Sequence, residues 1–86
     1  MTGRTALVVG GTSGIGLATA RLLRDAGATV HIAGRSKERL DKVSSSDPEL
    51  IGHQADGGTR DEIAAVADAI GSIDWLIITL SGNEGP

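Results

Sequence analysis

A glycine-rich junction near the amino terminus constrains the fold of this chain more than any other feature. The apolar run Thr5–Val9 leads directly into Gly10, and further glycines follow at positions 14 and 16. Because an amphipathic stretch comes next, the pattern indicates a buried strand that passes through a tight turn into a helix. Glycine at position 10 allows a backbone conformation that residues with a Cβ rarely adopt, as such a turn requires.

The same junction has the properties of an anion site. The first turn of a helix carries unpaired N–H groups and about half a positive charge, so it stabilises a phosphate placed there. Gly14 lets the backbone approach such a ligand, and Gly16 lets the helix pack closely on the strand. Thr12 and Ser13 add hydroxyl donors. We therefore expect a phosphate-binding loop, with a plain strand-to-helix turn as the alternative.

The spacing of the glycines narrows the class of nucleotide site. It reads G-x-x-x-G-x-G, which differs from the G-x-G-x-x-G fingerprint, and no Lys-Ser or Lys-Thr pair follows it as in a P-loop. P-loop ATPases and GTPases are therefore excluded. The position of the loop, after a strand and before a helix, is the one that a nucleotide-binding βαβ unit requires.

Strand and helix signals alternate along the whole chain. Strands are expected at residues 5–9, 29–33, 49–54 and 74–80, and helices at residues 15–26, from Ser36 as N-cap through Leu40 and Val43, and from the capping box Thr59-Arg60-Asp61-Glu62 through Ile70. The order βαβαβαβ implies a parallel sheet with right-handed crossovers and a ligand crevice at the carboxyl ends of the strands.

Apolar residues at helical spacing predict which face of each helix is buried. For the first helix the predicted buried face is Ile15, Ala18, Leu22 and Ala26, with Arg21, Arg24 and Asp25 outside and Gly27 as the C-terminal cap. For the third helix the predicted buried stripe is Ile63, Val66, Ala67 and Ile70, and Gly71 ends the helix. Residues 44–48 are predicted to be a connecting loop.

Composition sets limits on the class of protein. The 86 residues make one small domain, whose core must be aliphatic because Trp75 is the single aromatic residue. Without cysteine there is no disulfide or thiolate metal site, and a net charge of -3 offers no basic surface for nucleic acid. No apolar run approaches the roughly 20 residues that cross a bilayer, and Met1-Thr2-Gly3-Arg4 is too short for a signal peptide. We expect a soluble, cytoplasmic protein that does not bind membranes.

Taken together, these residues resemble the amino-terminal half of a classical short-chain dehydrogenase/reductase, a Rossmann-fold family that moves hydride between nicotinamide cofactors and alcohols or carbonyls. The resemblance covers essentially the whole chain. Residues 10–16 match the cofactor loop of the family, although Val9 stands where the family often has threonine. The resemblance implies a three-layer α/β half domain with a four-stranded parallel sheet of order 3-2-1-4, so that residues 1–86 form a single truncated NAD(P)-binding Rossmann domain.

The resemblance also implies binding residues. Contacts with the adenosine ribose and diphosphate fall to Gly10, Ser13, Gly14, Ile15 and Gly16. Asp56 matches an aspartate after the third strand that binds the adenine amino group, and Gly57 lies in the same loop; the alternative is that Asp56 is an ordinary residue of the loop that approaches the helix.

After the fourth strand the match is weaker. The family usually carries Asn-Asn-Ala-Gly there, whereas this chain has Thr79-Leu80-Ser81-Gly82. Gly82 fits the pattern and the other three residues do not. Ser81 and Gly82 are kept as candidate cofactor contacts.

The residues that follow the second strand favour NADP over NAD. An acidic side chain there would bind the ribose hydroxyls of NAD and repel a 2′-phosphate, but the sequence is Gly34-Arg35-Ser36-Lys37. Arg35 is expected to pair with the phosphate through charge-assisted hydrogen bonds, assisted by Ser36 and Lys37. The alternative is an Arg35 side chain that lies on the surface without a ligand.

No catalytic or metal-ligating residue is assigned. The Tyr-x-x-x-Lys pair that the family uses lies beyond the fourth strand, and this chain contains no tyrosine. We therefore expect an oxidoreductase-like protein that is inactive alone. His31 and His53 fall inside predicted strands, where a structural role is expected. Asp61, Glu62 and Asp68 are expected on the solvated face of the third helix.

Three hypotheses about function remain open. The first is an NADP(H)-binding protein that forms a homo-oligomer, most simply a twofold dimer, through the exposed fourth strand and the uncovered sheet face. The second is a self-associating structural or folding module that has lost cofactor binding. The third is one piece of a full enzyme. A methyltransferase is disfavoured because Arg35 stands where its ribose-binding acid is expected.

Overall fold

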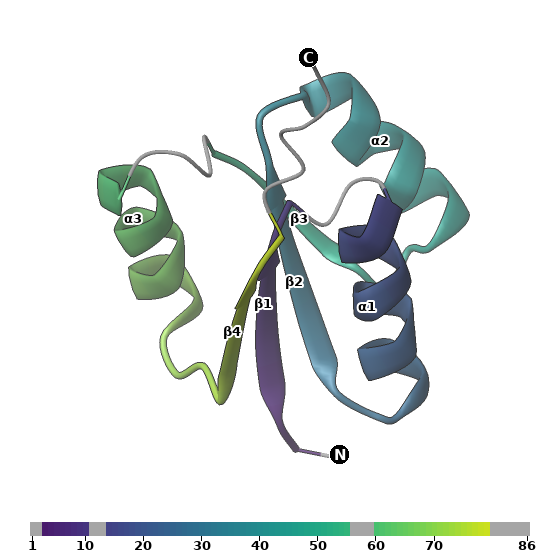
Figure 1. Cartoon of the computed structure of the whole chain (residues 1–86), viewed down its shortest axis with the longest axis horizontal. Helices are drawn as coiled ribbons and strands as arrows, with labels where there is room; N and C mark the ends of the chain where they lie inside the picture. Colours follow the sequence, from purple (N-terminus) through teal and green to yellow (C-terminus); the bar gives the residue numbers. More distant parts are fainter. Residues whose placement is uncertain (1–2, 11–13, 56–59, 80–86) are drawn as a thin grey trace.

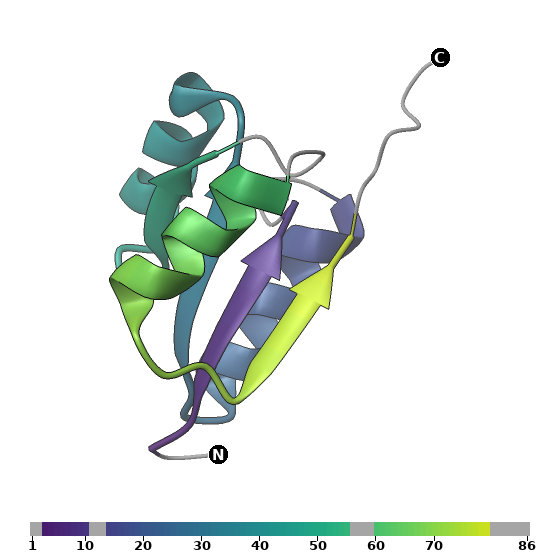
Figure 2. The same ribbon diagram turned by 90° about the vertical axis from the view of Figure 1, so that its left-hand side faces the viewer.

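The computed structural model describes residues 3–10, 14–55 and 60–79. In this part of the chain four parallel strands form one sheet in the order β3-β2-β1-β4, as predicted. The strands are β1 (Thr5–Val9), β2 (Thr29–Gly34), β3 (Ile51–Gln54) and β4 (Trp75–Ile78), and the helices are α1 (Gly14–Asp25), α2 (Lys37–Ser46) and α3 (Arg60–Ile70). Helices α1 and α2 cover one face of the sheet and α3 covers the other (Figures 1 and 2).

The central strand β1 is buried on both faces. Its residues 6–9 are at most 1% exposed, because the strand lies between β2 and β4 and under helices on both sides. Val8 belongs to the core cluster that includes Ile32 and Leu40, whereas Leu7 and Val9 belong to the cluster that includes Val66 of α3. Alternate residues of β1 therefore serve two cores, which explains its uninterrupted apolar sequence.

The predicted buried face of α1 is wrong. Ile15 is 78% exposed and Leu22 is 70% exposed, and Ala18 and Ala26 are exposed as well. The buried residues of α1 are Gly16 and Ala20, with Leu17 and Leu23 packed against the core.

The reason is the close approach of α1 to the sheet. Gly16 and Ala20 are four residues apart and so lie on one side of the helix, where their small size lets the helix backbone come near β1. Arg24 continues the same row. Its side chain is only 20% exposed because it pairs with Asp47.

The boundaries of other elements differ from the predicted ones by a few residues. β3 begins at Ile51 rather than at residue 49, and β4 spans four residues rather than seven. Residues 44–46 lie in α2 rather than in a loop, and Asp47 caps this helix by donating its N–H to Val43 O at 2.6 Å. Asp47 is 9% exposed, so the predicted solvated turn contains a buried carboxylate.

Other predictions of local structure are confirmed. The Ser36 hydroxyl accepts a hydrogen bond from Arg39 N at 3.2 Å and so caps α2. Gly27 follows α1 with φ +99°. Val66 is buried and Ile63, Ala67 and Ile70 are half-buried along α3, whereas Thr59 lies outside the described residues. Within the described residues no helix is long and apolar enough to span a membrane.

Candidate functional site

The turn after β1 is shaped by Gly10. This residue has φ +87° and donates its N–H to Ala33 O of β2 at 2.8 Å. A Cβ built on it would lie 2.1 Å from Thr79 O, a contact that no real side chain tolerates. The chain therefore turns out of the sheet at a point where only glycine fits.

Gly16 brings the first turns of α1 against this corner. A Cβ at Gly16 would lie 2.2 Å from Gly10 O and 2.5 Å from the Thr79 Oγ1 atom. The helix backbone thus packs directly on the ends of β1 and β4, as the sequence predicted for this glycine. The turn at Gly10 and the close packing at Gly16 together place the start of α1 at the carboxyl edge of the sheet.

Gly14 is the first residue of α1 and has φ +60°. Apart from Gly14 itself, its chain neighbours and the backbone of its own helix, no described atom lies within 4 Å of the place a Cβ would take, in contrast to the crowding at the other two glycines. Ile15 beside it is 78% exposed. The amino-terminal end of this 12-residue helix therefore offers backbone that a ligand can approach. We call Gly10, Gly14 and Gly16 the glycine corner; Thr12 and Ser13 lie outside the described residues.

The loop after β2 lies at the same edge of the sheet as the glycine corner, because β1 and β2 are parallel and paired in register. Arg35 is exposed and Ser36 is half-buried there. Gln54 at the end of β3 donates from Nε2 to Arg35 O at 3.2 Å, which ties the two strand ends together. Lys37 is in an exposed ion pair with Asp41 at 3.3 Å.

Besides Thr12 and Ser13, four further predicted binding residues are not placed by the structure. Asp56 and Gly57, and also Ser81 and Gly82, lie outside the described residues. The described residues nearest to them in the chain, Ala55 and Thr79, directly follow the carboxyl ends of β3 and β4, the edge at which the glycine corner lies.

His31 and His53 lie side by side on β2 and β3, with ring centroids 5.1 Å apart. His31 Nδ1 lies 2.9 Å from His53 Nε2, so the two rings share one hydrogen bond. Burial lowers the pKa of both imidazoles, and the neighbouring His53 lowers that of His31 further. Both residues lie within strands, as predicted, and one nitrogen of each ring is engaged in the shared hydrogen bond.

A pocket of about 280 Å³ lies between β3 and α3. Its lining residues are His53, Gln54, Ala55, Glu62, Ala65, Val66 and Ala69. None of them belongs to the glycine corner or to the loop after β2, so this pocket is not the predicted phosphate site.

Sequence reasoning missed Thr79 as part of the site. Its hydroxyl donates to Val9 O at 3.1 Å and lies 3.4 Å from Gly10 O. A signal was available in the sequence, because two residues there differ from the usual family pattern: Val9 before the first glycine and Thr79 after the fourth strand.

Comparison with known proteins agrees with this arrangement. The family model for short chain dehydrogenase matches residues 4–83. A short-chain dehydrogenase/reductase, PhomF of Diaporthe leptostromiformis, is 35% identical over an alignment 91 residues long, gaps included, which covers 98% of this chain and 31% of the relative.

Solved structures give the same result. A short chain dehydrogenase/reductase family protein aligns with a TM-score of 0.79 and 42% identity over 87% of this chain and 32% of the other. The citronellol catabolism dehydrogenase AtuB of Pseudomonas aeruginosa PAO1 aligns with a TM-score of 0.75 and 32% identity over 88% of this chain and 35% of the other. The chain thus spans about a third of the length of these relatives.

Proposed function

The chain belongs to the short-chain dehydrogenase family, whose members bind nicotinamide dinucleotide cofactors, and we propose that its glycine corner holds the diphosphate of NADP(H). The proposal depends on the backbone at Gly14, which starts a 12-residue helix and whose Cβ position has no described atom of another part of the chain within 4 Å. The N–H groups of a first helical turn and the helix dipole favour a phosphate there. Gly10 and Gly16 bring that helix end to the carboxyl edge of the sheet, where ligands of such folds bind.

The preference for NADP over NAD rests on Arg35. Its exposed side chain follows β2 at the same edge of the sheet, and a guanidinium pairs with a phosphate through two parallel hydrogen bonds. Ser36 contributes as well, because its oxygen accepts from Arg39 N and its proton is left to donate to a phosphate. Among the described residues Lys37 is held only by an exposed ion pair with Asp41, which is weak enough to exchange for a phosphate.

The cofactor would supply the hydride of an oxidoreductase reaction. The residues described above bind and orient it, and none is placed to exchange a substrate proton. Because the 86 residues contain no tyrosine, we propose that this chain alone binds the cofactor without turning over a substrate. A carbonyl-dependent oxidation of NADPH by the chain alone would contradict this part of the proposal.

Calorimetric titration of the chain with NADPH and with NADH tests which cofactor it binds more tightly. NADPH is expected to bind more tightly, and Arg35→Ala is expected to weaken NADPH binding by about 1 to 3 kcal/mol with little effect on NADH. Arg39→Ala is the matched control, since Arg39 is an exposed arginine on α2. Equal or tighter binding of NADH would refute the NADP preference, and no binding of either cofactor would favour the structural module.

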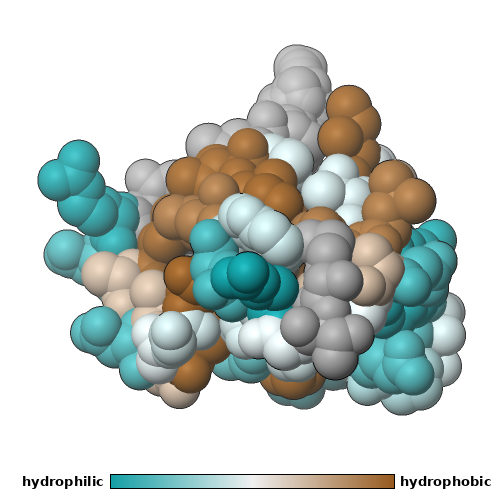
Figure 3. Space-filling view, turned by 90° about the horizontal axis from the view of Figure 1, so that it is seen from below, coloured by the Kyte–Doolittle hydropathy of each residue, from teal (hydrophilic) through white to brown (hydrophobic). Residues whose placement is uncertain are grey.

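We also propose that the chain self-associates through β4. In the described part of the chain β4 is an edge strand, and its Leu76 and Ile78 are each 51% exposed. Figure 3 shows hydrophobic surface gathered in the upper half of the view from below. Unpaired apolar edges of this kind associate with a second chain.

Light scattering of the chain at micromolar concentration tests this association. A dimer is expected, and Leu76→Lys is expected to dissociate it, because a charge on the edge strand opposes pairing. Asp68→Lys on the exposed side of α3 is the control and is expected to leave the dimer intact. A folded monomer for the unmodified chain would refute the proposal.

A further inference from the structure

Thr79 contacts the end of β1 through both its backbone and its side chain. Its N–H donates to Val9 O at 2.8 Å, and its hydroxyl donates to the same oxygen at 3.1 Å. A backbone carbonyl has two lone pairs, so Thr79 fills the accepting capacity of Val9. The amide on the other side of this peptide, Gly10 N–H, is held by Ala33 O at 2.8 Å. The Val9–Gly10 peptide is therefore fixed from both sides.

The side chain of Thr79 also fills the space between two glycines. Its Oγ1 atom lies 2.9 Å from the Cβ position of Gly10 and 2.5 Å from that of Gly16. It lies 3.4 Å from Gly10 O, the first carbonyl after the strand. One hydroxyl group thus touches the point at which the chain leaves β1 and the point at which α1 packs back on it.

We propose that Thr79 is a positioning residue for the glycine corner, and that its hydroxyl sets the direction in which the backbone leaves β1 toward the amino-terminal end of α1. This inference rests on the proposed cofactor function, which it deepens. Val9 has no hydroxyl of its own to donate at the end of β1. The hydroxyl that fixes this turn is supplied instead from the end of the neighbouring strand β4.

The decisive comparison is between Thr79→Val, which removes the hydroxyl and keeps the shape, and Thr79→Ser, which keeps the hydroxyl. Two readouts are used: the NADPH dissociation constant, and hydrogen–deuterium exchange of the amides of residues 10–16 without cofactor. Thr79→Val is expected to weaken NADPH binding by about two- to tenfold, the worth of one hydrogen bond, and to speed exchange in that stretch. Thr79→Ser is expected to keep both the dissociation constant and the exchange rates of the unmodified chain. Thr29→Val at the opposite end of the sheet is the matched control.

The outcomes separate this inference from the proposed function. If Thr79→Val lowers the melting temperature but leaves the dissociation constant and the exchange of residues 10–16 unchanged, Thr79 is merely structural and the inference is wrong. If the unmodified chain binds no NADPH, the proposed function fails, and the exchange comparison alone decides whether Thr79 positions the corner. Should Thr79→Val not fold, Thr79→Ala and Thr79→Ser provide the same comparison.

Discussion

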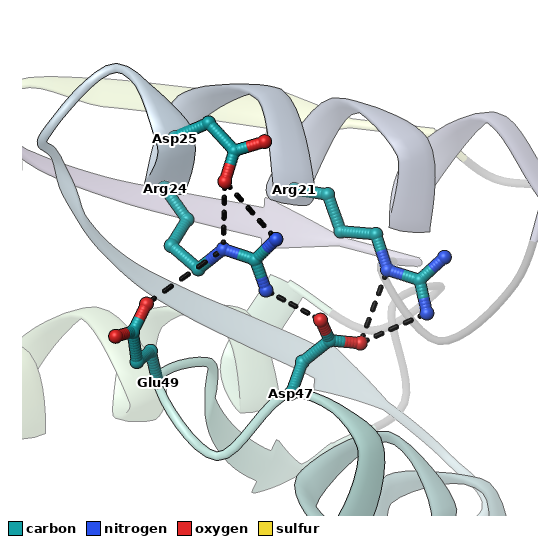
Figure 4. Close-up of polar contacts among 5 residues, drawn as sticks. All are labelled: Arg21, Arg24, Asp25, Asp47 and Glu49. Carbon is teal, nitrogen blue, oxygen red and sulfur yellow. Dashed lines mark hydrogen bonds and ion pairs between the residues drawn. The ribbon is translucent and has the colours of Figure 1, made fainter.

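Arg24 of α1 and Asp47, the residue that caps α2, form an ion pair that joins the two helices (Figure 4). Arg24 Nη1 donates to Asp47 Oδ1. The second carboxylate oxygen, Oδ2, accepts from Arg21 Nε at 3.0 Å and from Arg21 Nη2 at 2.8 Å. Hydrogen bonds from Arg24 and then Arg21 hold the pKa of Asp47 below its usual value of 3.8. Both oxygens of a nearly buried carboxylate are therefore satisfied by arginines of one helix.

Asp47→Asn is expected to lower the melting temperature. The amide keeps the size of the carboxylate, but its NH₂ group cannot accept from an arginine, so one of the two guanidinium groups loses its hydrogen bond to residue 47, and the charge that attracts both is removed. Asp41→Asn is the control, because its pair with Lys37 is exposed at both ends and is worth about 0.3 to 0.5 kcal/mol. Thermal unfolding followed by circular dichroism measures both variants. Equal changes in the two would show that the Arg24–Asp47 contact adds nothing beyond a surface pair.

The same carboxylate predicts a loss of stability in acid. The pKa of Asp47 is lower in the folded state than the unfolded value of 3.8, so its contribution is fully present above that pH and is lost as the pH falls below it. The free energy of unfolding by urea, measured from about pH 7 to about pH 3, should therefore fall less steeply below pH 3.8 in Asp47→Asn than in the unmodified chain. Parallel curves for the two proteins would contradict the assignment.

The paired imidazoles of His31 and His53 act in a different pH window. Burial lowers both pKa values below 6.5, so the unfolded chain takes up protons before the folded one does. Stability is therefore full above pH 6.5 and declines as the pH falls below it toward the folded pKa. His53→Gln is expected to flatten this decline, since an amide does not titrate and leaves His31 without a neighbouring charge. The melting temperature between about pH 7.5 and pH 5 measures the effect, and an unchanged slope in the variant would count against it.

Most of the fold could be predicted from the sequence, because β1 is a continuous apolar run and because Ser36 and Gly27 mark helix ends. The buried face of α1 could not. Ile15, Ala18, Leu22 and Ala26 repeat at helical spacing just as Gly16, Ala20 and Leu23 do. The period fixes the helix but not its rotation, and the close contact of Gly16 with Gly10 decides it.

Contacts between residues far apart in the chain could not be predicted from the sequence either. Asp47 follows Arg24 by 23 positions. The sequence predicts a polar loop there, whereas in the structure Asp47 follows α2 and contacts α1. Thr79 and Gly10 are 69 positions apart, and only the pairing of β4 with β1 brings them together. The strand-to-helix turn at the glycine corner was predictable, because its glycines stand between an apolar run and an amphipathic stretch in the sequence itself.

The three glycines of the corner should respond differently to alanine. Gly10→Ala combines a strained φ of +87° with a Cβ 2.1 Å from Thr79 O, and it is expected to cost about 2 kcal/mol or more of stability. Gly16→Ala has ordinary helical φ but meets Gly10 O at 2.2 Å, so α1 must move away from the sheet. Gly14→Ala meets no described atom of another part of the chain within 4 Å and bears only the strain of φ +60°, about 1 kcal/mol.

We therefore expect Gly14→Ala to affect cofactor affinity much more than stability. Its new methyl group would stand where the diphosphate approaches the backbone, so Gly14→Ala is expected to weaken NADPH binding by about tenfold or more while the chain stays folded. Circular dichroism and calorimetry on the same samples measure the two effects. Gly71→Ala is the control. Gly71 also has positive φ, +97°, and beyond its chain neighbours no described atom lies within 4 Å of its Cβ position. It follows α3, away from the corner. If both variants bind NADPH as the unmodified chain does, the diphosphate does not lie against Gly14.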